Sequence, residues 1–102
     1  MKQTKDKAES FVWSDCQFKD VAHDREKRQL WITLNDYRSK RWRFLFSDIE
    51  ELTLADPIFC VRSTHTTKAG KKRIVLYDDD NEPALEFCYS TVERHEPQAA
   101  VD

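Results

Sequence analysis

QLWITLN at residues 29–35 and RWRFLFS at residues 41–47 decide the fold class of this chain. In both runs, large apolar side chains occupy every second position. Successive side chains of a strand point to opposite faces, so this period of two predicts strands with one buried face. The polar segment 35–40 has the length of a hairpin loop, which predicts that the two strands pair antiparallel.

The same alternation continues outside this hairpin. It predicts strands at 72–78 and 84–92, two more at 15–22 and 58–65, and a short one at 51–55. Val21 falls out of register in its run, which indicates a bulge. The segment around 47–51 is also compatible with one helical turn. We therefore expect an all-β fold, an antiparallel meander of six to seven strands that forms a small barrel or a two-sheet sandwich.

The register of these strands predicts the core, and the chain length predicts one domain. We expect residues 1–10 to be disordered or frayed, residues 11–94 to form a single β domain, and residues 95–102 to form a flexible tail. Gly70 is the only glycine, so we expect a tight turn there and longer turns elsewhere. The predicted core residues are Leu30, Ile32, Leu34, Trp42, Phe44, Phe46, Ile74, Leu76, Leu85 and Phe87.

Composition limits the partners and the compartment. The 102 residues carry 17 basic and 19 acidic side chains, a net charge of −2, so no global field attracts nucleic acid or an anionic membrane. No apolar run is long enough to span a bilayer, and the first ten residues lack the apolar core of a signal peptide. Three widely spaced cysteines, with no C-x-x-C, favour a cytoplasmic protein with buried thiols.

Motifs of catalysis and of metal binding are missing from the sequence. Glycine-rich phosphate loops, G-x-S-x-G and H-E-x-x-H are absent. The histidines at 23, 65 and 95 are not spaced with another ligand as in zinc sites. The acidic run 78–82 lacks the spacing of an EF-hand, and we expect contiguous aspartates not to converge on one ion. We therefore expect a protein that is not an enzyme and holds no cofactor.

Basic side chains are interleaved with aromatic ones at 38–44, a composition that suits nucleic acid. A second basic segment flanks Gly70, and the two would form one patch if they lie close together. The strand register opposes stacking of bases here, because Trp42 and Phe44 are expected to face the core. The residues of this alternative nucleic-acid patch are Arg38, Lys40, Arg41, Arg43, Lys71, Lys72 and Arg73.

A longer arrangement covers residues 13–54. WSDC at 13–16 is followed by Phe18 and Asp20, then by LWITL at 30–34 and FLFSDIEELTL at 44–54. This arrangement resembles small bacterial immunity-type proteins of polymorphic toxin systems, with Ser14 where their opening carries histidine. The resemblance implies a non-enzymatic inhibitor that presents acidic side chains to a toxin.

The acidic side chains that could make such contacts are Asp36, Asp48, Glu50, Glu51, Asp56, Asp78, Asp79, Asp80 and Glu82. We therefore expect another protein as the partner, with nucleic acid as the alternative, and no membrane. We expect the chain to be a monomer or a homodimer.

Overall fold

The computed structural model describes residues 11–55 and 59–95. Nine strands lie within these ranges: β1 (Cys16–Asp24), β2 (Gln29–Asn35), β3 (Arg41–Ser47), β4 (Glu50–Leu54), β5 (Phe59–Cys60), β6 (Arg62–Lys68), β7 (Lys71–Tyr77), β8 (Pro83–Tyr89) and β9 (Thr91–His95). The structure has more strands than the six to seven expected, because the predicted strands at 58–65 and 84–92 are each divided in two. The expectations for residues 1–10 and 96–102, and Asp56, lie outside the described residues, whereas His95 belongs to β9.

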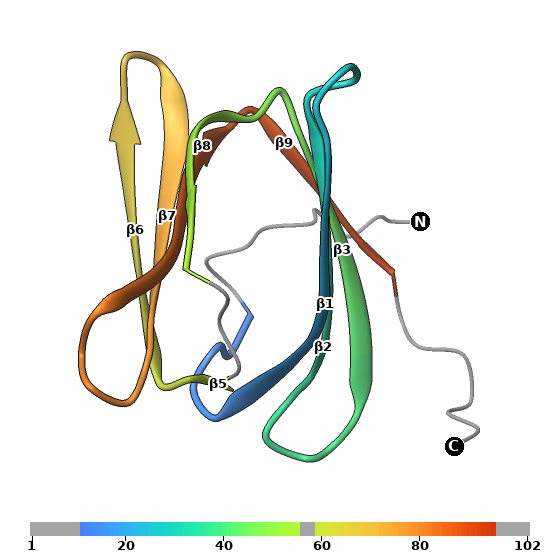
Figure 1. Ribbon diagram of the computed structural model, residues 1–102, viewed down its shortest axis with the longest axis vertical. Coiled ribbons are helices and arrows are strands. Elements are labelled where there is room, and N and C mark those ends of the chain that lie inside the picture. The colour runs from blue at the N-terminus through green and yellow to red at the C-terminus, as the bar shows by residue number, and fades with distance from the viewer. Residues whose placement is uncertain (1–10, 56–58, 96–102) are drawn as a thin grey trace, which may run out of the picture.

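The strands form two antiparallel sheets that face each other (Figure 1). One sheet has the order β5-β1-β2-β3-β9 and the other the order β4-β8-β7-β6. The predicted all-β antiparallel fold is confirmed in its sandwich form, because neither sheet closes on itself within the described residues. Meander order holds for β1-β2-β3 and for β6-β7-β8, while β4, β5 and β9 pair with strands distant in sequence.

The predicted core is confirmed for nine of its ten residues, which are completely buried. The tenth, Trp42, is half-buried and packs against the core. Leu30 lies opposite Phe46 and Ile32 opposite Phe44, so the inward side chains of β2 and β3 form one layer. Trp13 lies outside any strand, yet it is also buried in the same core cluster.

The chain changes sheets four times, and two of these switch points are neighbours in space. Between β3 and β4, Asp48 adopts a φ of 63° and no helical turn forms, so the alternative of a turn at 47–51 is wrong. Between β8 and β9 the switch is at Ser90, whose backbone N–H donates to the Ser47 carbonyl at 3.0 Å. The Ser90 hydroxyl donates to Asp48 Oδ2 at 2.7 Å, so hydrogen bonds hold the two switch points together.

The turns follow the expectation set by the single glycine. Ala69 and Gly70, with φ values of 52° and 82°, form the two-residue turn between β6 and β7. The loops 25–28, 36–40 and 78–82 that close the other hairpins are longer. β1 contains the predicted bulge, a register shift between Phe18 and Asp20.

Candidate functional site

The hairpin between β2 and β3 is organised by the carboxylate of Asp36. Its Oδ1 accepts the backbone N–H groups of Arg38 and Lys40, each at 2.9 Å. Its Oδ2 accepts the indole N–H of Trp42 at 2.8 Å. The backbone N–H of Asp36 donates to the Lys40 carbonyl at 2.8 Å, which closes the loop. Asp36, predicted to contact a partner, therefore serves the turn itself.

These hydrogen bonds change the acidity of Asp36. Partial burial opposes ionisation, but the N–H groups of Lys40, Trp42 and Arg38 outweigh it and hold the pKa of this carboxyl below its ordinary value.

We expect the stability of the chain to depend on the charge of Asp36 in acid. Because folding lowers the pKa of Asp36, its contribution is complete above the ordinary value of 3.8 and is lost as pH falls through the folded value. Urea unfolding of the wild type and of Asp36→Asn from pH 6 to pH 2 measures this. The variant should be about 1 kcal/mol less stable near neutral pH, with the difference shrinking in acid. Parallel pH profiles would contradict the role of the charge.

A groove lies beside this turn, with a volume of about 210 Å³. We call it the hairpin groove; it is lined by Phe11, Val12, Asp36, Tyr37, Arg38, Lys40 and Trp42. Val12 and Tyr37 are 53% and 52% exposed, the highest values among the large apolar side chains of the described residues. The Phe11 and Trp42 rings meet edge to face at a centroid distance of 5.7 Å.

Cations surround the aromatic rings of the hairpin groove. Lys40 Nζ lies 5.5 Å from the centroid of the Trp42 ring, and the Arg94 guanidinium lies 5.3 Å from it. Arg38 Nε donates to the Tyr37 hydroxyl at 3.0 Å. Within residues 11–55 and 59–95, neither Arg38 nor Lys40 forms an ion pair within 4 Å, although the Asp36 carboxylate attracts the charge of Arg38. Both cations can therefore still pair with an acidic group of a ligand.

Three predicted partner-binding carboxylates are instead occupied by the chain's own cations. Asp48 and Glu50 both pair with Arg28, at 3.1 and 2.8 Å, and with Lys71, at 3.1 and 2.9 Å. Glu51 pairs with Lys68 at 2.8 Å. Hydrogen bonds from Ser90 and Lys71 lower the pKa of Asp48, and bonds from Lys71 lower that of Glu50. We call this group, with Arg73 and Glu86, the ion-pair cluster.

The second basic segment therefore differs from the first. Arg73 pairs with Glu86 and lies 3.5 Å from Glu51. Lys71 pairs with Asp48 and Glu50. These contacts neutralise the positive charge that was predicted around Gly70. The β6–β7 turn and the β2–β3 turn also lie at opposite ends of the molecule (Figure 1), so the two basic segments do not form one patch.

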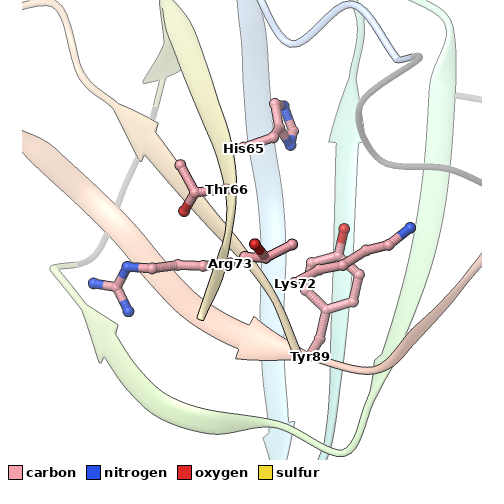
Figure 2. A pocket seen from close by; sticks show the side chains of 6 residues that line it. His65, Thr66, Lys72, Arg73 and Tyr89 are labelled. Carbon is pink, nitrogen blue, oxygen red and sulfur yellow. The ribbon is translucent and has the colours of Figure 1, made fainter. Parts of the chain in front are cut away.

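A second pocket, of about 240 Å³, lies at the edge formed by β6. Figure 2 shows Lys72 and Tyr89 pointing to one side of the strands and Arg73 and Thr66 to the other. Adjacent positions of a strand must diverge in this way, so these side chains do not converge on one ligand. The Nε2 of His65, which also lines the pocket, is 2.9 Å from the Ser63 hydroxyl.

The remaining predicted residues occupy separate places. Arg43 lies on the outer face of its sheet, 4.0 Å above the Trp31 ring, and Arg41 Nε donates to Asn35 Oδ1 at 3.2 Å. In the acidic turn, Asp78 Oδ1 accepts the backbone N–H groups of Asp80 and Glu82, at 2.9 and 3.0 Å.

The acidic turn departs from one expectation. Carboxylate oxygens of Asp78, Asp79 and Asp80 lie within 4.8 Å of one another, so contiguous aspartates do gather here. One of these carboxylates is already engaged by the turn, and Asp79, Asp80 and Glu82 are exposed to solvent.

Sequence reasoning located the basic half of the hairpin groove but missed Phe11, Val12 and Tyr37. Tyr37 offered a signal, because an aromatic residue within a polar hairpin loop has no strand face to bury it. Val12 had none, because its position depends on how the segment before β1 packs.

The described residues contain no apolar helix of the length needed to cross a bilayer. Comparison of the chain with models of protein families, with curated proteins and with solved structures gives no match.

Proposed function

We propose that this chain is a non-enzymatic, cytoplasmic protein-binding module and that the hairpin groove is its binding surface. One observation carries the proposal: exposed Val12 and Tyr37 lie beside Arg38 and Lys40, neither of which forms an ion pair with a carboxylate of the described residues. Tyrosine, tryptophan and arginine are the residue types that contribute most to the energy of protein interfaces.

The groove favours a partner segment that places an apolar side chain over Trp42 and a carboxylate near Arg38 and Lys40. At about 210 Å³ it is smaller than the roughly 300–1,000 Å³ of small-molecule sites. Its rim is positive although the whole chain is negative, so charge complementarity selects an acidic segment. The net charge of −2 supplies no global field that would strengthen the binding of a nucleic acid.

A toxin is one partner of this kind, and the resemblance over residues 13–54 supports it. That range includes Tyr37, Arg38, Lys40 and Trp42 of the groove. Asp48, Glu50 and Glu51 are engaged in the ion-pair cluster, so the proposed contact with a toxin moves from these carboxylates to the groove.

A capture experiment with matched charge reversals tests the proposal. The tagged wild type, Arg38→Glu/Lys40→Glu and Arg25→Glu/Lys27→Glu are incubated with cytosol of the source cell, and retained proteins are quantified by mass spectrometry. Arg25 and Lys27 are exposed on the β1–β2 turn, at the other end of the molecule, so the control changes net charge equally (Figure 1). We expect one protein to be retained by the wild type and the control and reduced about 10- to 100-fold in the groove variant.

Direct titration of that purified protein must then reproduce the loss of affinity. Equal retention by all three forms would contradict the groove as the binding surface. A labelled 20-nucleotide single strand is titrated in parallel. If it binds, loses affinity steeply with added salt and is released by the groove variant, the partner is nucleic acid and the protein-binding proposal is wrong.

A further inference from the structure

Two buried thiols lie directly opposite each other at one edge of the five-stranded sheet. Cys16 of β1 and Cys60 of β5 are register partners, and both are completely buried without being joined in a disulfide. Opposite residues of antiparallel strands have Cα atoms about 4.5–5.5 Å apart, within the 4.4–6.8 Å or so that a disulfide spans. Direct partners also project to the same face, so the two sulfur atoms share one side of the sheet.

The third cysteine has a different environment. Cys88 lies in β8, in the other sheet, and its register partners are Glu50 and Arg73. Its Sγ lies 3.7 Å from Arg73 Nη1. The fold thus brings together one pair of cysteines, 16 and 60, and provides a buried internal control in the third.

Burial makes the pair slow to react in the closed fold. It raises the pKa of Cys16 to about 12, with a further contribution from Cys60, and it raises the pKa of Cys60 to about 11. Each thiol donates to a backbone carbonyl, Cys16 to Val12 at 3.4 Å and Cys60 to Arg62 at 3.3 Å.

Access to the pair depends on β5. This strand has only two residues, forms an edge of its sheet and pairs with β1 alone. Short edge elements open locally at a small fraction of the free energy of global unfolding. Opening of β5 would expose Cys60 and then Cys16, whereas Cys88 lies on a strand paired on both sides.

We propose that Cys16 and Cys60 form a redox modification site, at which a small disulfide of the glutathione type converts them into an intramolecular disulfide. The Cys60 thiolate attacks the S–S bond of the oxidant, which breaks, and a mixed disulfide forms while one thiolate leaves. The Cys16 thiolate then attacks Cys60 Sγ, the protein disulfide forms and the second thiolate leaves. The two protons end on the two released thiols, so the protein loses two electrons and the oxidant gains them.

Oxidation is measured on the purified chain with excess oxidised glutathione, in buffer and in urea below the unfolding transition, which speeds local opening. We expect the loss of two hydrogen atoms from the intact mass, and a tryptic peptide pair joined through Cys16 and Cys60. The bond closes a long loop, so Tm should rise by about 10 °C and return on reduction. Cys88→Ser should behave as the wild type. Cys16→Ser and Cys60→Ser should show neither the linked peptide pair nor the rise in Tm.

The outcomes separate cleanly. A linked peptide that contains Cys88, a stable mixed disulfide with glutathione, or three unmodified thiols in both conditions would each overturn the assignment. Loss of the linked peptide in Cys88→Ser would do the same.

Discussion

Phe44→Asp is expected to abolish cooperative folding. Phe44 is completely buried, and its ring lies 4.9 Å from Phe11, 5.1 Å from Trp13 and 6.0 Å from Phe46 between centroids. Removing a buried aromatic ring costs about 3–5 kcal/mol, and an unpaired carboxylate in its place adds a large desolvation cost. Together these two costs are comparable to the roughly 5–15 kcal/mol by which a domain is stabilised against unfolding. Far-UV circular dichroism with a urea titration should show no unfolding transition.

Arg43→Asp is the matched control, because it introduces the same side chain one position away on the outer face. Arg43 is exposed, and its guanidinium stacks on Trp31, an interaction worth about 0.5–1 kcal/mol at such a site. We expect a loss of about 1 kcal/mol with the transition preserved. Similar losses in both variants would mean that the register of β3 is shifted by one residue.

The sequence predicted these two strands well because the signal is local. β2 and β3 have the bounds 29–35 and 41–47 that the alternation indicates, and the face that each residue takes follows from its parity. The bulge in β1 was also visible, since Val21 breaks the period.

Sheet switching was not predictable in the same way. The alternation through residues 84–92 looks like one strand, yet the run divides at Ser90, and β8 and β9 join different sheets. That division depends on which strands lie alongside, β4 and β7 for one piece and β3 for the other. Pairings between residues so distant in sequence leave little trace in a short window.

In the candidate site, too, features formed by neighbours in sequence were predictable, and contacts between distant residues were not. The basic and aromatic composition around Arg38 and Trp42 was visible, and the turn that presents it closes through Asp36, a neighbour in sequence. The ion-pair cluster was not visible in the sequence, because Lys71 is far along the chain from Asp48 and Glu50. The fold places the connection between β3 and β4 beside the β6–β7 hairpin, and only there do these side chains pair. Two sets of charges that each suggested a binding surface in the sequence neutralise each other in the fold.

Trp13→Ala is expected to destabilise the chain by about 3–5 kcal/mol, although Trp13 lies in no strand and was not predicted to belong to the core. Only 2% of this residue is exposed, and its ring contacts Phe11 at 4.9 Å and Phe44 at 5.1 Å between centroids. The segment before β1 therefore contributes to the core of the sandwich.

Trp31→Ala removes the same side chain from the outer face of β2 and should cost only about 1 kcal/mol, because Trp31 is half-buried beneath Arg43. Urea unfolding of both variants, monitored by circular dichroism, gives the comparison. If the two losses were equal, Trp13 would add no more to the core than a surface ring does. Residues 11–15 would then be an appendage of the sandwich, and the position of Val12 in the hairpin groove would lose its structural basis.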